Sequence, residues 1–124
     1  MSQHILIVDD EKNIAISVDY LLRREGFEVS VAHDGEEGMR LIREERPDLV
    51  LLDIMMPKLD GFQVCETVRQ DPTLANIRIV MLTAKGRDAE KEKGLALGAD
   101  AYITKPFSTR ELISQVKALL EPSA

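Results

Sequence analysis

The chain has 124 residues, of which 44% are hydrophobic and 31% are charged, and its formal net charge is −6 at pH 7. This length is enough for one hydrophobic core but not for two, so we expect a single domain over residues 1–124. The hydrophobic content excludes a disordered segment, the negative charge disfavours direct binding to nucleic acid, and no hydrophobic run is long enough to span a membrane.

The predicted elements alternate between strand and helix five times. The first strand, residues 5–8, is entirely hydrophobic, which is typical of a strand covered on both faces in a parallel sheet. A helical pattern follows it, and a similar pattern ends the chain, where Leu112, Val116 and Leu119 share one face. The first helical face contains Ile14, Val18, Leu21 and Leu22, and the later predicted strands are residues 29–32, 49–52, 79–82 and 101–103.

Helix boundaries are marked by capping residues and glycines. Asp34, Asp60 and Ser108 each stand three residues before a Glu or Gln, which is the spacing of a capping box at a helix start. Gly26 and Gly98 suit the left-handed residue that ends a helix. Five alternating units favour an α/β fold, in which an open, doubly wound parallel sheet has helices on both faces and the weaker strands, 29–32 and 101–103, at its edges.

Three other residues are expected to be structural, and the N-terminus gives no targeting signal. The single cysteine, Cys65, lies at helical spacing from hydrophobic residues, so we expect it in the core. His4 and His33 lack metal-ligand spacing and are expected at the surface. Residues 1–4 do not resemble the start of a signal peptide, so a cytoplasmic protein is expected.

Chemically reactive side chains follow the ends of the predicted strands. Asp9 and Asp10 follow the first strand, Asp53 the third and Thr83 the fourth, while Lys105 comes shortly after the fifth. In an open α/β sheet, ligands bind outside the carboxyl ends of the strands. We therefore expect three carboxylates, a hydroxyl and an ammonium group to meet at one edge of the sheet.

Each of these residues alone has an ordinary structural explanation, such as a helix-start carboxylate, a capping threonine or a solvated lysine. Together, Asp9, Asp10 and Asp53 would repel one another in a partly buried cleft, so one of them must bind a proton or a cation. Mg²⁺ prefers such oxygen ligands. Asp53 would then attack phosphorus, with Lys105 neutralising the transferred group and Thr83 donating a hydrogen bond to it.

These residues resemble the receiver domains of two-component response regulators over essentially the whole chain. The resemblance rests on Asp9-Asp10, the segment 53–61 (DIMMPKLDG), Thr83-Ala84, and the segment 98–107 (GADAYITKPF). It implies a flavodoxin-like sheet with strand order 2-1-3-4-5. It also implies a phosphoacceptor switch, not an enzyme for external substrates, that receives its phosphoryl group on Asp53 from a sensor histidine kinase or a phosphotransfer protein.

The resemblance also assigns a ligand set for Mg²⁺. Asp10, Asp53 and the backbone carbonyl of Met55 would hold the ion, and Asp9 would reach it through water. Lys105 would pair with Asp53 or with its phosphate, and the Lys105-Pro106 peptide bond would be cis.

The switch itself is likewise implied by the resemblance. Thr83 would move toward the phosphate and Tyr102 would turn inward, which would change the surface formed by helix four, strand five and helix five. From the sequence alone, Tyr102 is equally well explained as an amphipathic residue on an edge strand. Met55 and Lys85 stand where the family adjusts the attack of water on the phosphoaspartate, although a solvated loop lysine is the simpler explanation for Lys85.

Two other classes of protein fit the sequence less well. A flavin-type carrier on the same sheet would need a neutral loop after the first strand, and Asp9-Asp10-Glu11 has the wrong charge. A phosphohydrolase of the haloacid dehalogenase type would have a second Asp two residues after the first, where this chain has Met55.

A third alternative is the receiver of a DNA-binding regulator, cut from its output domain. Only four residues follow Leu120, which is too few for a helix-turn-helix. Lys91 and Glu111 could form an ion pair across a dimer, but Ala101 and Gln115 stand where further charged partners are expected. We therefore favour a stand-alone receiver, a monomer or a weak phosphorylation-dependent dimer, that acts on an unknown downstream protein.

Overall fold

Strands and helices alternate through the computed structural model, which describes residues 3–84 and 86–120. The expectations for Lys85 and for the two chain ends fall on residues outside that part. The elements in chain order are β1 (His4–Val8), α1 (Lys12–Arg24), β2 (Glu28–Ala32), α2 (Gly35–Glu45), β3 (Leu49–Asp53), α3 (Gly61–Gln70), β4 (Arg78–Ala84), α4 (Asp88–Ala96), β5 (Ala101–Lys105) and α5 (Thr109–Leu120).

The strands form one parallel sheet in the order β2-β1-β3-β4-β5. This order and the five strand–helix units confirm the predicted α/β fold, and β2 and β5 occupy the two edges as expected. Three strands, β3, β4 and β5, continue beyond their hydrophobic segments at the carboxyl end. Asp53 pairs with Leu82, and Thr83 pairs with Thr104, so that polar residues take part in the strand pairing at the carboxyl edge.

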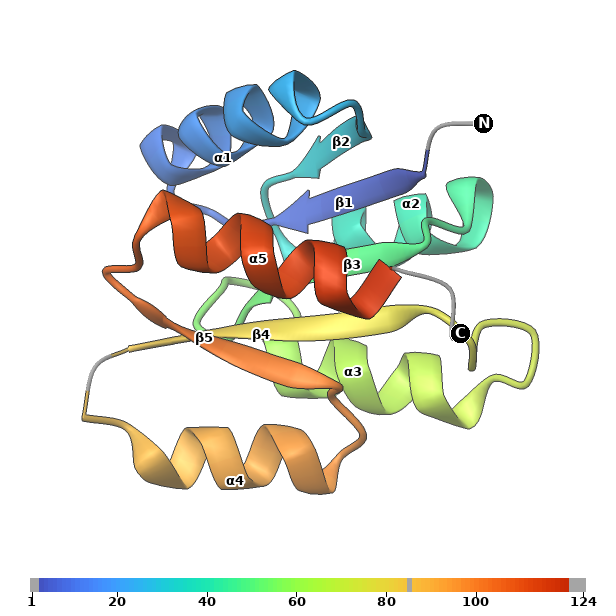
Figure 1. Ribbon diagram of the computed structural model, residues 1–124. Helices are drawn as coiled ribbons and strands as arrows, with labels where there is room; N and C mark the ends of the chain where they lie inside the picture. The colour runs from blue at the N-terminus through green and yellow to red at the C-terminus, as the bar shows by residue number, and fades with distance from the viewer. Residues whose placement is uncertain (1–2, 85, 121–124) are drawn as a thin grey trace.

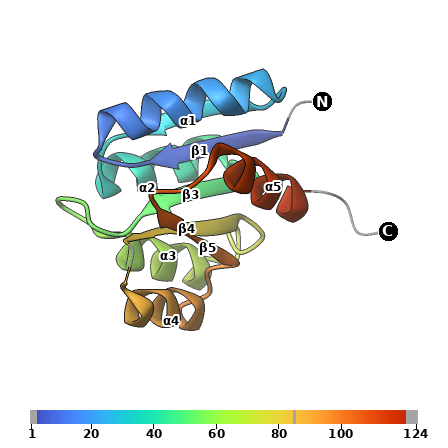
Figure 2. The same cartoon turned by 60° about the vertical axis from the view of Figure 1, so that its left-hand side comes forward.

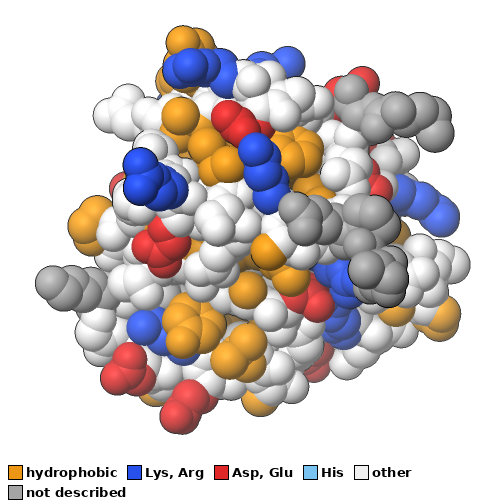
Figure 3. Space-filling model, in the orientation of Figure 1, with side chains coloured by type: hydrophobic (Ala, Val, Ile, Leu, Met, Phe, Trp, Pro, Cys, Tyr) orange, Lys and Arg blue, Asp and Glu red, His pale blue; other side chains and the backbone are white. Residues whose placement is uncertain are grey.

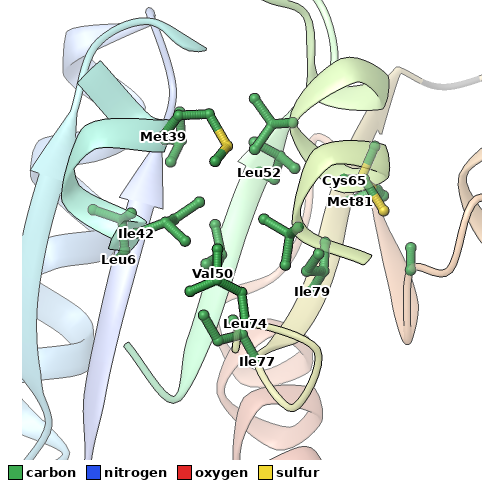
Figure 4. Close-up of a cluster of buried hydrophobic side chains, with 14 of the residues drawn as sticks. Leu6, Met39, Ile42, Val50, Leu52, Cys65, Leu74, Ile77, Ile79 and Met81 are labelled. Carbon is green, nitrogen blue, oxygen red and sulfur yellow. The ribbon is translucent and has the colours of Figure 1, made fainter. Parts of the chain in front are cut away.

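Helices cover both faces of the sheet (Figure 1). Helices α1 and α5 pack on one face, where their buried residues meet Ile5 and Ile7 of β1. Helices α2 and α3 pack on the other face, where they meet Leu6 and Val8 (Figure 4). Successive strand residues point to opposite faces, so hydrophobic segments without polar alternation supply both cores at once.

The capping signals are confirmed to different degrees. Asp60 forms a complete capping box with Gln63 at the start of α3. Asp34 accepts a hydrogen bond from the backbone of Glu37, whose own side chain instead accepts from the backbone of His33. Ser108 accepts from the backbone of Glu111. The two glycine stops are also confirmed, because Gly26 and Gly98 have φ values of +94° and +109°.

Helix α4 is held to the sheet less firmly than the other helices. Gly94 is its only buried residue, and a Cβ atom there would lie 3.2 Å from the side chain of Met81. The chain after α4 is tied down by Arg69 of α3. Its guanidinium donates to the carbonyl groups of Gly98, Ala75 and Ile77 and to the carboxylate of Asp100.

The remaining structural predictions are confirmed with one correction. Cys65 is fully buried and His33 is exposed. His4 is not a free surface residue, because its Nε2 atom lies 2.8 Å from the Ser30 hydroxyl and 3.1 Å from the Glu45 carboxylate. Among the described residues, no helix combines the length and the apolar character needed to cross a membrane.

Candidate functional site

The predicted site residues meet at the carboxyl edge of the sheet, from which the loop after β3 projects (Figure 2). Asp9 and Asp10 directly follow β1, whereas Asp53 and Lys105 are the last residues of β3 and β5. Thr83 lies inside β4. The sequence placed three of these residues just beyond the strands. The strands hold them instead, so each of these side chains is positioned by a paired backbone rather than by a loop.

Three carboxylates are brought together as expected. One oxygen from each of Asp9, Asp10 and Asp53 can be chosen such that these atoms all lie within 4.8 Å of one another. Asp9 is fully buried and Asp53 is 6% exposed, whereas Asp10 is exposed. Two of the three carboxylates are therefore largely removed from water. Like charges at this separation repel more strongly in such a buried site than they do in water.

Asp53 is harder to ionise than an ordinary aspartate. Burial raises the pKa of Asp53 to about 7, and the neighbouring carboxylate of Asp9 adds to this effect, while Lys105 opposes it. A carboxylate that is hard to ionise in this way is relieved by a proton or by a cation. The sequence predicted this conflict, and the raised pKa of Asp53 is one expression of it.

Lys105 is the cation of the site. Its Nζ atom lies 2.9 Å from Asp9, 3.0 Å from Glu11 and 3.4 Å from Asp53. Burial opposes the charge on the ammonium, but hydrogen bonds to Asp9 and Glu11 and the charge on Asp53 raise the pKa of Lys105 above its usual value. Lys105 therefore stays protonated, and it is shared among three carboxylates instead of pairing with Asp53 alone. The Lys105-Pro106 peptide bond is cis, which confirms that prediction.

The loop after β3 forms one wall of the site. Met55 is 69% exposed and lines a cavity of about 370 Å³ together with Asp53 and Lys105. A hydrogen bond from the backbone of Gly61 to the carbonyl oxygen of Ile54 closes the loop. The carbonyl group of Met55 is thus carried by a short, closed loop next to the carboxylates.

The two predicted switch residues differ in exposure. Thr83 is fully buried, and its hydroxyl has no hydrogen-bond partner within residues 3–84 and 86–120. Tyr102 is 37% exposed, and Nζ of Lys91 lies 4.9 Å from the centre of its ring. Cation–π attraction of this kind stabilises the outward position of the ring.

A family model for the response regulator receiver domain matches residues 5–117. The chain belongs to this family. Among solved structures, it is similar to a protein from Chloroflexus aurantiacus J-10-fl assigned as a response regulator, with 38% identity, a TM-score of 0.93 and coverage of 97% of this chain and 98% of that chain. It is also similar to the chemotaxis response regulator CheY4 of Vibrio cholerae, with 31% identity, a TM-score of 0.91 and coverage of 97% and 100%.

A receiver domain from a signal transduction histidine kinase of Syntrophus aciditrophicus is similar as well, with 34% identity, a TM-score of 0.89 and coverage of 96% of this chain and 90% of that chain. This chain therefore has the receiver fold that the resemblance implied. Its donor set also fits a hard divalent cation, because three carboxylates meet where two of them are buried. Asp9, Asp10 and Asp53 are the carboxylates of this receiver domain that could hold the ion, and the part of the carbonyl group of Met55 stays a prediction.

One contact of the receiver site was not predicted. The sequence placed Glu11 only in the acidic segment after the first strand and gave it no role, but its side chain reaches Lys105. Only the spacing along the sequence, directly after Asp9 and Asp10, places Glu11 at the carboxyl edge. No periodic pattern could have shown that it faces Lys105.

Proposed function

We propose that this receiver domain is a phosphorylation switch in which Asp53 accepts a phosphoryl group. The observation that carries the proposal is the convergence of Asp9, Asp10 and Asp53 within 4.8 Å, with the ammonium group of Lys105 beside them. Negative oxygens at this density are tolerable with a divalent cation, and the same cation neutralises a transferred phosphoryl group. When bound, Mg²⁺ supplies charge neutralisation to both carboxylate and phosphoryl oxygens.

The donor in this proposal is a phosphohistidine of a sensor histidine kinase or of a phosphotransfer protein. A carboxylate oxygen of Asp53 attacks phosphorus, the new P–O bond forms as the P–N bond breaks, and the histidine ring takes up a proton. Lys105 then faces the phosphoryl oxygens, and the free hydroxyl of Thr83 has a donor available for one of them. Later attack of water on phosphorus returns Asp53 to the free carboxylate, and no external substrate is turned over.

The signal in this proposal leaves through the surface formed by α4, β5 and α5. Hydrophobic side chains reach the surface over α4 and β5 (Figure 3). Among the residues of these two elements, Leu95 and Tyr102 are exposed large hydrophobic residues. Movement of Thr83 toward the phosphate would open space next to β5, and Tyr102 would turn into that space. A coupling free energy of roughly 1–3 kcal/mol is enough to change the affinity for a partner about fivefold to a hundredfold.

The partner in this proposal is a protein, either a separate chain or an output domain. The net charge of −6 disfavours direct binding to nucleic acid. The phosphorylated form is proposed to be a monomer or a weak dimer. Size measurement with and without beryllofluoride, which mimics the phosphoryl group, tests site and assembly together.

The decisive experiment is phosphorylation by a small phosphodonor, such as acetyl phosphate, in the presence of Mg²⁺. We expect intact-mass measurement to show one phosphoryl group on the wild type and none on Asp53→Asn, which has no carboxylate nucleophile. Asp48→Asn is the matched control, because Asp48 lies at the opposite end of β3 and bonds to the backbone of His4. Undiminished labelling of Asp53→Asn would overturn the assignment of the acceptor.

A further inference from the structure

Glu11 has no part in the chemistry described so far, yet it holds the cation of the site. Its Oε1 atom lies 3.0 Å from Nζ of Lys105, closer than the 3.4 Å between Lys105 and Asp53. Lys105 is the residue proposed to face the transferred phosphoryl group. Glu11 and the phosphorylated Asp53 would therefore compete for the same ammonium group.

The local structure aims Glu11 at Lys105 and not at its own helix. Glu11 is the N-cap residue of α1, but its side chain makes no capping hydrogen bond, and the first turn of α1 contains no acidic residue. A carboxylate at a helix start is ordinarily stabilised by the free backbone N–H groups and the helix dipole. The backbone N–H of Glu11 donates to Oδ1 of Asp9 at 2.9 Å, which fixes the residue while its carboxylate turns to Lys105.

Exposure distinguishes the two shorter ion pairs of Lys105. The side chain of Glu11 is 58% exposed, whereas that of Asp9 is 0% exposed. Breaking an exposed ion pair costs little free energy, whereas a buried carboxylate that loses its partner destabilises the protein strongly. When negative phosphoryl oxygens arrive beside Lys105, Glu11 is therefore the partner that can be released into water.

We propose that Glu11 is a positioning residue that draws Lys105 away from Asp53 in the unphosphorylated protein and thereby weakens the binding of a phosphoryl group. This inference rests on the proposed function, because it concerns the lysine that would face the phosphoryl oxygens. Removal of the Glu11 charge should strengthen the binding of an anionic phosphoryl mimic by about twofold to fivefold, the range expected for an exposed ion pair.

The test is a calorimetric titration with beryllofluoride in saturating Mg²⁺, so that changes in metal affinity do not enter. The variants are Glu11→Gln, which removes the charge, and Glu11→Asp, which keeps the charge on a side chain one methylene shorter. Glu90→Gln is the matched control. Glu90 lines the same cavity, but it forms no ion pair with Lys105 within the part of the chain that the structure describes.

We expect Glu11→Gln to bind beryllofluoride about twofold to fivefold more tightly than the wild type, Glu11→Asp to lie between them, and Glu90→Gln to change less. Unfolding temperatures measured in Mg²⁺ show whether the variants keep the wild-type stability. If the role of Glu11 were merely structural, its substitution would lower this temperature. Equal tightening in Glu11→Gln and Glu90→Gln would overturn the inference, because the effect would then be one of general charge. Weaker binding by Glu11→Gln would overturn it as well.

The two proposals fail in different ways. A wild type that does not bind beryllofluoride in Mg²⁺ would overturn the proposed function and, with it, the role of Glu11. A wild type that binds, together with a Glu11→Gln variant of the same affinity, would overturn only the role of Glu11.

Discussion

Nζ of Lys105 lies 3.4 Å from Oδ1 of Asp53, although the two residues end different strands of the sheet. Strand β4 lies between β3 and β5, so the backbone fixes the positions from which the two side chains start, and their rotamers bring the charged atoms together. The ammonium group is therefore already next to the proposed acceptor before any phosphoryl group arrives. Little movement of the lysine is needed for it to contact a phosphoryl oxygen.

Lys105→Ala should destabilise the metal-free protein by about 2–4 kcal/mol, because it leaves the buried carboxylate of Asp9 without its cation. It should retain Mg²⁺ binding but lose phosphorylation. Urea unfolding and labelling by acetyl phosphate measure the two effects. Lys58→Ala is the control, because Lys58 forms an exposed pair with Asp34 and should cost less than about 1 kcal/mol. Normal labelling of Lys105→Ala would contradict the role assigned to this residue.

Asp10→Ala should weaken Mg²⁺ binding roughly tenfold or more while preserving the fold, because an exposed ligand is lost and no core packing changes. Isothermal titration with Mg²⁺ measures the affinity, and the unfolding temperature in EDTA checks the fold. Glu66→Ala removes an exposed carboxylate from α3 and serves as the control for net charge. An unchanged affinity of Asp10→Ala would place the metal elsewhere.

The metal-free protein should lose stability as the pH rises. Burial raises the pKa of Asp53 from 3.8 to about 7, so the folded state holds a proton that the unfolded chain has already released. The stabilisation is complete below about pH 4 and is lost as the pH approaches 7, with a total of about 4 kcal/mol.

Unfolding temperatures of the wild type and Asp53→Asn in EDTA test this pH dependence. The unfolding temperature of Asp53→Asn relative to that of the wild type should rise by roughly 15 °C from pH 4 to pH 8. Saturating Mg²⁺ should reduce the difference, since the cation takes the place of the proton. If the unfolding temperatures of the two proteins changed in parallel with pH in EDTA, the pKa of Asp53 would not be raised and the prediction would be wrong.

Thr83→Val should stabilise the unphosphorylated protein by about 1 kcal/mol, because it replaces a buried, unpaired hydroxyl with a methyl group of similar size. The same change should weaken the response of Tyr102 to beryllofluoride, as the phosphoryl mimic loses a hydrogen-bond donor. Urea unfolding and the NMR signals of the Tyr102 ring measure these effects. Thr104→Val, at the paired position of β5, is the control. A full response of Tyr102 in Thr83→Val would show that the movement of Tyr102 does not depend on the Thr83 hydroxyl, contrary to this prediction.

The fold was predictable because the local signals agree with one another. Hydrophobic segments without alternation predicted strands buried on both faces, and the two cores that share β1 are the result. The ends of the strands were predicted less well. The predicted third strand stopped at Leu52, but backbone pairing continues through Asp53, because a strand ends where its hydrogen bonds end and not where its hydrophobic residues end.

The site was predictable as a set of residues but not as a set of contacts. Convergence of Asp9, Asp10 and Asp53 follows from the topology of a parallel sheet. The sharing of Lys105 among three carboxylates does not, because it depends on side-chain rotamers and on burial that only coordinates give. The same holds for Arg69, which appeared in no pattern although its guanidinium joins α3 to Asp100.

Helix α4 gives the molecule a compliant part. Its single buried residue is a glycine against Met81, so tilting the helix exposes little hydrophobic area and costs little free energy. The chain beyond its carboxyl end is anchored where Arg69 binds Gly98 and Asp100, so that end acts as a pivot. A change of side-chain positions at the carboxyl edge of the sheet should therefore displace the amino end of α4, while the sheet and the other helices keep their positions.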